Sequence, residues 1–164
     1  MNRLFVICEI GSNWCSFEQA KDSISLAKAC GADAVKFQRF TFNDIYGFSI
    51  GNEIFHGEIV AEWLPKLKEK ADAVGIEFMC SAFSPDLFAA VDPLVKRHKI
   101  ASSDNQCPQI IKAAYSFGKP VIVSLGAISE TDIRRVLPLL DRERTTLMYC
   151  NAAGTTCQTN VYPA

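Results

Sequence analysis

Several polar and charged residues stand where short apolar runs of this chain end. Glu9 follows the run at 4–8, and Lys36 and Gln38 lie at the end of the run at 34–37. A parallel (β/α) barrel gathers the carboxyl ends of its strands at one mouth, where chemistry takes place. The residues that we predict to share such a mouth are Glu9, Asn13, Lys36, Gln38, Ser81, Ser102, Ser103, Asp104, Ser124, Cys150 and Asn151.

The composition of this set favours an anion site. A lysine supplies positive charge, while serine hydroxyls and loop N–H groups supply directed hydrogen bonds. Phosphate is the anion that such a set favours. Glu9 and Asp104 add carboxylates suited to proton transfer, or to binding a metal or a hydroxyl group.

Each of these residues also has a structural interpretation. Lys36 fits a strand-end lysine that buries its alkyl chain and keeps its amine in water. Glu9 fits an ion-pair partner of Lys36, an arrangement that is also compatible with function. Serine is common after strands, so Ser102, Ser103 and Ser124 are individually weak evidence.

The strands that would position these residues are short, rich in Val, Ile, Phe and Cys, and covered on both faces, since they show little polar alternation. They are predicted at 4–8, 34–37, 77–80, 99–102, 121–124 and 146–150. The helical patterns between them lie at 17–30, 58–74, 85–94 and 108–117, with a last helix that opens at Ser129. Glycine follows three of these helices, as is typical of a C-terminal cap.

The alternation of strand and helix predicts an α/β fold with a parallel sheet and right-handed crossovers. The later strands begin about 22 to 25 residues apart, which is typical of a TIM-type (β/α) barrel. A closed barrel has eight strands, whereas about six βα units are expected here. The alternatives are an incomplete barrel or an open, doubly wound sheet. Unpaired edges favour a partner chain, a dimer or truncation.

Composition excludes several classes of protein. The chain has 164 residues, of which 49% are hydrophobic and 21% charged, and its formal net charge is −1. It lacks the basic footprint of a nucleic-acid-binding protein. The apolar run at 4–8 is too short for a signal peptide or a membrane span, so we expect a cytoplasmic protein. The seven cysteines include no C-x-x-C pair, which favours reduced core residues over zinc ligands.

Four segments resemble the sialic acid synthase (N-acetylneuraminate synthase) family. They are Glu9-Ile10-Gly11 with Asn13, GADAVKFQ at 31–38, KIAS at 99–102 and GKPVIVSLG at 118–126. The block at 31–38 is the most specific match. The resemblance covers the chain and implies the first six βα units of the family's barrel. It implies one synthase-type domain over 1–164 that lacks the last two units and the family's C-terminal antifreeze-like domain.

The resemblance also implies an activity. Family members condense phosphoenolpyruvate with N-acetylmannosamine or a related amino sugar to a nonulosonic acid and release phosphate. A divalent metal, Mn or Mg, polarises the sugar aldehyde as a Lewis acid. The family's metal-binding histidines come from strands seven and eight, which we expect this chain to lack. His56 and His98 do not match those ligands.

The roles of individual residues follow from the same match. Phosphoenolpyruvate is assigned to Lys36, Ser81, Ser102 and Ser124, the sugar to Glu9 and Gln38, and the candidate catalytic residues are Glu9, Lys36 and Asp104. Asp104 stands where the family has a glutamate. Near the chain's end, Asn160 and Tyr162 match the family's Asn-x-Tyr-Pro stretch and are further candidates for substrate binding.

Departures from the family pattern keep alternatives open. The family's Asn-His-Asn-Gly reads NWCS at 13–16, its Ser-Thr-Pro-Phe reads CSAF at 80–83, and its Ser-Gly-Glu reads SSD at 102–104. These changes favour a truncated or degenerate, non-catalytic relative that keeps at most a phosphoenolpyruvate site. A third alternative is another phosphoenolpyruvate-using synthase of seven- or eight-carbon keto acids. The expected partners are small-molecule substrates, with a homo-oligomer or a completing partner segment.

Overall fold

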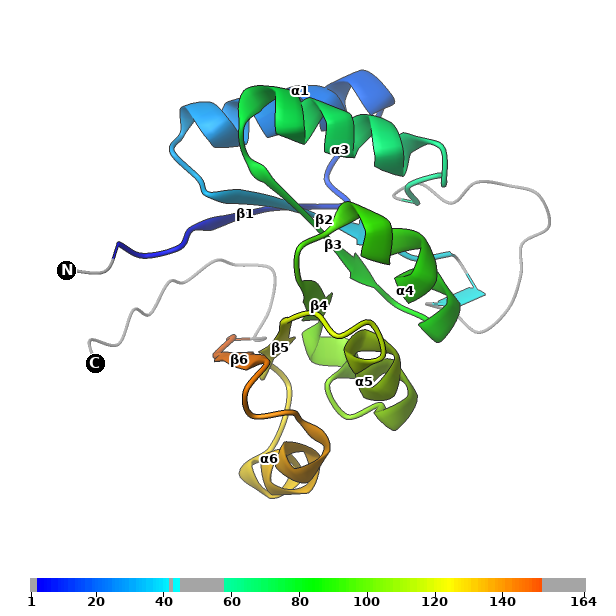
Figure 1. Ribbon diagram of the computed structural model, residues 1–164, viewed down its shortest axis with the longest axis vertical. Coiled ribbons are helices and arrows are strands. Elements are labelled where there is room, and N and C mark those ends of the chain that lie inside the picture. Colours follow the sequence, from blue (N-terminus) through cyan, green and yellow to red (C-terminus); the bar gives the residue numbers. More distant parts are fainter. Residues whose placement is uncertain (1–2, 42, 45–57, 152–164) are drawn as a thin grey trace.

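Six parallel strands form one sheet in the order β1-β2-β3-β4-β5-β6 within the computed structural model, which describes residues 3–41, 43–44 and 58–151. The strands are β1 (Ile7–Gly11), β2 (Ala34–Arg39), β3 (Glu77–Ala82), β4 (His98–Ile100), β5 (Val121–Ser124) and β6 (Thr145–Met148). The sheet curls into a half-barrel (Figure 1). The predicted α/β fold, an incomplete TIM-type barrel, is thereby confirmed.

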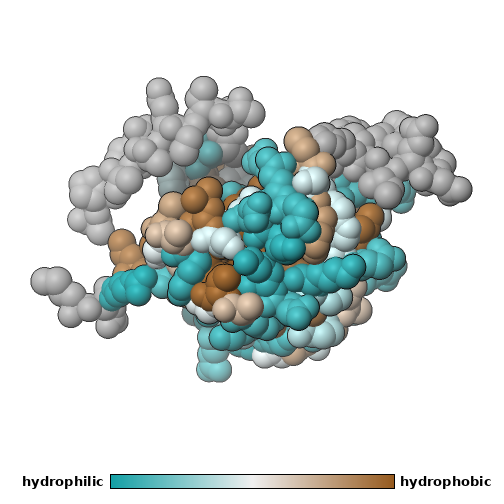
Figure 2. Space-filling view, turned by 90° about the horizontal axis from the view of Figure 1, so that it is seen from above, coloured by the Kyte–Doolittle hydropathy of each residue, from teal (hydrophilic) through white to brown (hydrophobic). Residues whose placement is uncertain are grey.

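Helices cover the outer face of this sheet. They are α1 (Phe17–Ala29), α3 (Trp63–Val74), α4 (Pro85–Val91), α5 (Pro108–Tyr115) and α6 (Glu130–Val136), with short 3-10 turns η1 (Asp92–Leu94), η2 (Ser102–Asp104) and η3 (Leu137–Leu139). In Figure 1, α1 and α3 lie side by side over β1 to β3, and α4, α5 and α6 follow the curl of the sheet. The surface on the side of α1 and α3 is mostly hydrophilic, with scattered apolar patches (Figure 2).

Local sequence explains where several helices begin and end. The hydroxyl of Ser16 accepts a hydrogen bond from the backbone N–H of Gln19 at the start of α1, and Ser129 accepts one from Asp132 at the start of α6. Gly75 ends α3 with a φ of 71°, a left-handed conformation in which glycine is favoured. Ser84 precedes Pro85 at the start of α4, but its side chain forms no capping hydrogen bond.

The boundaries of some elements differ from those predicted. β1 begins at Ile7 rather than residue 4, because the Val6 N–H donates to the side-chain carboxylate of Asp33 at 2.8 Å, in place of a strand carbonyl. Glu9 therefore lies inside β1. The α3 helix begins at Trp63 rather than residue 58.

The inner face of the sheet changes from apolar to polar along the strands. Residues two apart on a strand share a face, because side chains alternate. The apolar inner layer contains Ala34, Met79 and Ile122, with Ile7 and Met148 packed against it. Two residues further along the same strands come Lys36, Ser81, Ser124, Glu9 and Cys150. The inner face of the sheet thus carries an apolar layer and, next to it at the carboxyl ends of the strands, a polar layer.

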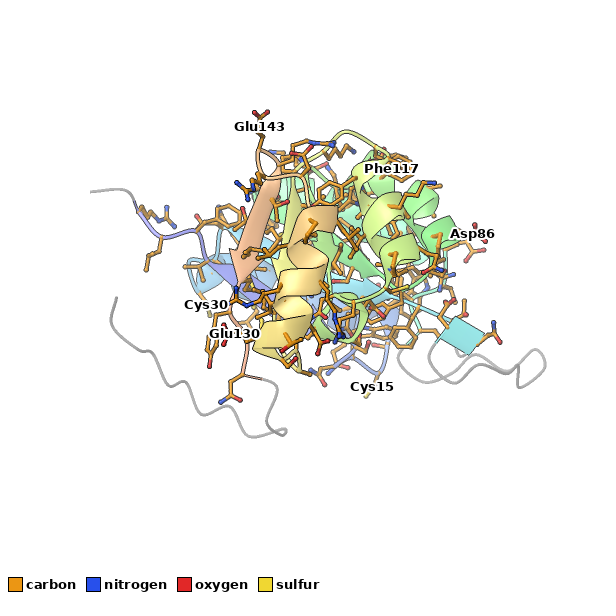
Figure 3. The ribbon with its side chains drawn as sticks, turned by 90° about the horizontal axis from the view of Figure 1, so that it is seen from below. Cys15, Cys30, Asp86, Phe117, Glu130 and Glu143 are labelled. Carbon is orange, nitrogen blue, oxygen red and sulfur yellow. The ribbon has the colours of Figure 1, made fainter. Side chains whose placement is uncertain are left out.

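The two ends of the half-barrel are distinct. Phe117 and Glu143, from the loops that precede β5 and β6, lie at one end, and Cys15, which follows β1, lies at the other (Figure 3). The larger hydrophobic core lies between the sheet and the helices, around Phe37, Phe78 and other buried side chains. No helix in the described part of the chain is both long and apolar enough to cross a membrane.

Candidate functional site

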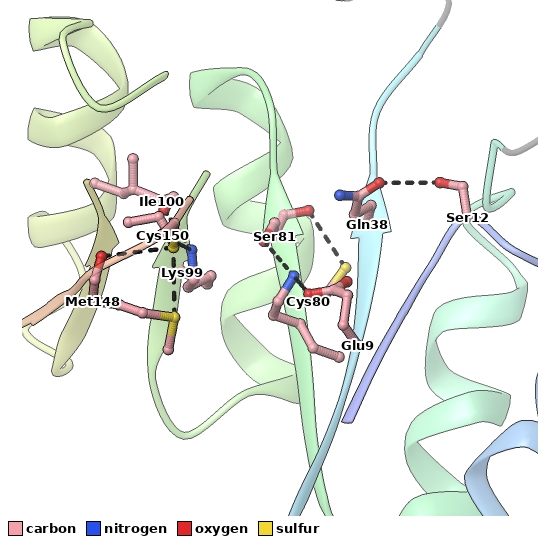
Figure 4. Close-up of polar contacts among 11 residues, drawn as sticks. Glu9, Ser12, Gln38, Cys80, Ser81, Lys99, Ile100, Met148 and Cys150 are labelled. Atoms are coloured by element: carbon pink, nitrogen blue, oxygen red, sulfur yellow. Dashed lines mark hydrogen bonds and ion pairs between the residues drawn. The ribbon is translucent and has the colours of Figure 1, made fainter. Parts of the chain in front are cut away.

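Lys36 points from β2 into the polar layer, and its side chain is 7% exposed. Its Nζ forms an ion pair with Glu9, the residue opposite it on β1, and donates to the Ser81 hydroxyl at 3.3 Å. The strand-end interpretation, with the amine in water, is therefore wrong. The ion-pair interpretation of Glu9 is confirmed, and the Glu9 side chain remains 48% exposed at the open side of the pair (Figure 4).

A second buried lysine, Lys99, enters the same layer from β4. It is 4% exposed, and its Nζ donates to Ser124 Oγ at 2.5 Å and to the Ile100 carbonyl at 2.7 Å. The sequence interpretation included Lys99 only within a matched segment and assigned it no role. The rule that selected Lys36, a charge at the carboxyl end of an apolar strand, passed over Lys99 because Lys99 begins the strand predicted at 99–102.

The electrostatics of Lys99 show that the polar layer is one connected site. Burial, the main cause, and the positive charge of Lys36 together lower the pKa of Lys99 to about 8. Cys150, Glu9 and Asp104 act in the opposite direction. Residues from four different strands or strand-end loops therefore act on a single amine.

The loops after β4 and β5 meet directly behind this amine. The hydroxyl of Ser102 accepts a hydrogen bond from the backbone N–H of Gly126 at 3.2 Å. A Cβ atom at Gly126 would lie 2.6 Å from that hydroxyl and 3.1 Å from the Cβ of Cys150. Only glycine permits this approach without displacing Ser102 or Cys150.

Asp104 and Gln38 lie on opposite sides of the layer. The Ser103 hydroxyl donates to Asp104 at 3.1 Å, and burial is the main cause of a raised pKa for the Asp104 carboxyl. On β2, the side-chain oxygen of Gln38 accepts from the Ser12 hydroxyl at 3.2 Å. Gln38 is also opposite Ser81, which is in turn opposite Lys99 in the strand register.

Other predicted residues are placed elsewhere. Asn160, Tyr162 and the segment 46–56, with His56, lie outside the described residues. His98 lies at the amino end of β4, where it is fully buried and contacts Asp92. It is therefore remote from the strand ends that carry the site.

The described residues do not fit the divalent metal that the resemblance implies. Within residues 3–41, 43–44 and 58–151, no three His, Cys, Asp or Glu side chains come together in a way that could hold a metal ion. Glu9 is engaged with Lys36, and Asp104 with Ser103. We therefore derive no chemical step through a metal.

Comparisons with known proteins show a family match and similarity to several sugar acid synthases. The model of the NeuB family matches residues 23–161. Human N-acetylneuraminate-9-phosphate synthase is 30% identical, over 83% of this chain and 43% of its own length. Pseudaminic acid synthase of Campylobacter jejuni is 26% identical, over 87% of this chain and 47% of its own length.

The fold is also that of a solved synthetase. The N-acetylneuraminic acid synthetase of Leptospira borgpetersenii, crystallised with citrate, superposes with a TM-score of 0.87 at 24% identity, over 96% of this chain and 57% of that one. The chain spans less than half the length of the curated relatives named above. It corresponds to part of their fold.

Proposed function

Because this chain belongs to the NeuB family, we propose that it carries the phosphoenolpyruvate-binding side of a sialic-acid-synthase-type site. The reaction would be condensation of phosphoenolpyruvate with N-acetylmannosamine or a related amino sugar, with release of phosphate. The observation that carries this proposal is the pair of buried lysines, Lys36 and Lys99, each bound to a serine hydroxyl in one polar layer.

Two buried lysine amines that lack anionic partners lower the stability of the fold. Burial disfavours the charged form of a lysine, and each of these lysines raises the cost of the other. Glu9 compensates Lys36, whereas within the described residues the Lys99 amine donates to a hydroxyl and a carbonyl. A ligand with two anionic groups, a phosphate and a carboxylate, would supply the missing negative charge.

The serine hydroxyls would complete the binding of the anion. Ser124 accepts a hydrogen bond from Lys99, and its own hydroxyl donates to the Met148 thioether sulfur at 4.0 Å, a weak acceptor that a ligand oxygen would replace. Ser81 likewise accepts a hydrogen bond from Lys36. Together these groups would hold and orient the phosphate and carboxylate of phosphoenolpyruvate, which places its enol carbon on the open side of the layer.

Carboxylates and an amide would serve the second substrate. Glu9 and Gln38 stand next to each other around Gly11 and would face the sugar. Asp104, whose carboxyl has a pKa raised mainly by burial, would take part in proton transfer during the addition of water or the loss of phosphate. These roles are proposals from geometry and family membership.

One observation favours the alternative of a non-catalytic relative. Trp14 stands where the family pattern has histidine, and it is 6% exposed with its ring 5.2 Å from that of Trp63. An aromatic side chain of the core between the sheet and the helices thus stands where the family pattern has a polar group. Under this alternative the chain binds phosphoenolpyruvate but does not turn it over.

Two measurements distinguish these proposals. The first is a thermal melt with and without phosphoenolpyruvate plus Mn²⁺, since binding to the native state raises the midpoint. The second follows phosphate release on addition of N-acetylmannosamine. A raised midpoint with phosphate release supports the synthase proposal, and a raised midpoint alone supports the non-catalytic alternative. An unchanged midpoint contradicts both.

A further inference from the structure

Asn105 lies behind the site and reaches from one loop to the next. It follows η2 and is fully buried, with an exposed fraction of 0%. Its side-chain Nδ2 donates to the carbonyl of Ser124 at 3.0 Å and to that of Gly126 at 3.1 Å. One amide group therefore holds both the last residue of β5 and a residue of the loop that follows it.

The side-chain oxygen of Asn105 indicates a specific role for this residue. The Oδ1 atom of Asn105 is buried and has no hydrogen-bond partner among the described residues. An unpaired buried carbonyl lowers stability, so a residue needed only to fill space would be better apolar. What Asn105 uniquely supplies here is its two N–H donors.

The same loop is held from two other directions. The backbone N–H of Gly126 donates to Ser102, and that of Leu125 donates to the Met148 carbonyl at 2.8 Å. The residue after Gly126, Ala127, has a φ of 52°, in the left-handed region that is unfavourable for alanine. Such a loop needs external hydrogen bonds to keep this conformation.

We propose that Asn105 is a positioning residue that fixes the Ser124 hydroxyl against the Lys99 amine. It acts through the backbone of residues 124–126 and touches no ligand itself. This inference deepens the proposed function, on which its binding test rests. The contact it maintains, Lys99 to Ser124, is present without ligand and is measurable separately.

The test compares Asn105→Ala with Ser124→Ala, with the double variant and with Gln106→Ala, an exposed neighbour, as the matched control. The ligand-free readout is the titration midpoint of Lys99, followed by ¹³C NMR of its Cε. We expect Asn105→Ala and Ser124→Ala to shift this midpoint in the same direction by similar amounts, and the double variant to add nothing. Gln106→Ala leaves it unchanged.

The binding readout is the affinity for phosphoenolpyruvate. We expect each single variant to weaken binding roughly tenfold, as for the loss of one hydrogen bond to a charged group. The double variant should equal Ser124→Ala within about twofold, because the two residues act on one contact. Additive losses would overturn the proposal.

A purely structural role predicts a different pattern. In that case Asn105→Ala lowers the melting temperature but leaves the Lys99 titration unmoved, and this result overturns the proposal even if phosphoenolpyruvate does not bind. Absence of binding by the unmodified chain would instead count against the proposed function alone. If Asn105→Ala does not fold, Asn105→Ser, which keeps one donor, undergoes the same comparison with the same two outcomes.

Discussion

The amine of Lys99 lies 2.5 Å from the hydroxyl of Ser124, across the boundary between β4 and β5. Lys99 lies between His98 and Ile100 on β4, Ser124 ends the otherwise apolar strand β5, and both are buried. The contact joins the second lysine of the site to the loop that Asn105 holds in place. The geometry of the site therefore depends both on the register of the strands and on the packing of the loops.

Binding of phosphoenolpyruvate should weaken as the pH rises through 8. The pKa of Lys99 in the ligand-free fold is about 8, so above this pH the amine loses the charge that attracts the anion. Calorimetric titrations between pH 7 and 9.5 measure the effect. A Lys99→Arg variant, charged throughout this range, should bind with little dependence on pH, and an equal dependence in both proteins would contradict the assignment.

Burial of Lys99 should lower the free energy of unfolding. The pKa of Lys99 falls from 10.5 in a free lysine to about 8 in the fold, so between these values the unfolded chain binds more protons than the folded one. Stability then rises with pH across that window, and the full cost is present below it. We expect Lys99→Met to raise the melting temperature at pH 7 by a few degrees, about the size of a single core change.

The control for that prediction is Lys96→Met, which changes an exposed lysine next to β4. It should leave the melting temperature within about one degree, as for most surface substitutions. A lower melting temperature for Lys99→Met would show that the amine stabilises the fold and would contradict this account of its burial.

Glu9 should compete with the ligand for Lys36. Its carboxylate forms an ion pair with Lys36 in the ligand-free protein, and an incoming phosphate must share or displace that contact. Glu9→Gln should therefore strengthen phosphate binding, by roughly three- to tenfold for one partly exposed ion pair. Equilibrium titration with inorganic phosphate measures this, with Glu18→Gln on α1 as the control. Weaker binding by Glu9→Gln would mean that Glu9 supports the anion site.

At the other end of the half-barrel, His98 should make the free energy of unfolding depend on pH. Burial between the rings of Phe88 and Phe117 lowers its pKa below 6.5, while Asp92 opposes the shift and Lys119 reinforces it. The unfolded chain therefore binds the proton more readily, and stability is lost as the pH falls through 6.5.

Thermal melts at pH 7.5 and pH 5 test this expectation. The unmodified protein should lose more stability over this interval than His98→Phe, which keeps an aromatic ring but does not titrate. Because Asp92 is present in both proteins, the difference between them isolates the histidine. Equal losses would show that another group carries the dependence.

The strand pattern and the charges at strand ends were sufficient to predict much of this structure. The apolar runs placed all six strands, and the position of Lys36 within its run predicted its place in the polar layer. Its ion pair with Glu9 followed because adjacent parallel strands bring their ends together. These features depend on local periodicity, which a sequence displays directly.

Features that depend on contacts between loops were not predicted. Asn105 is one amide in a polar stretch, and nothing local indicates that it bonds to residues 19 and 21 positions later. The start of β1 was also misplaced, because the Val6 N–H donates to the carboxylate of Asp33, 27 positions further along the chain. Such contacts are fixed by the assembled fold.

The central claim is that Lys36 and Lys99 together bind phosphoenolpyruvate, and isothermal titration calorimetry tests it most directly. The proteins to compare are the unmodified chain, Lys36→Met, Lys99→Met and the exposed-lysine control Lys96→Met. We predict saturable binding by the unmodified chain and the control, and loss of binding in both buried-lysine variants while cooperative unfolding is retained. Binding of equal affinity in all four proteins would contradict the account.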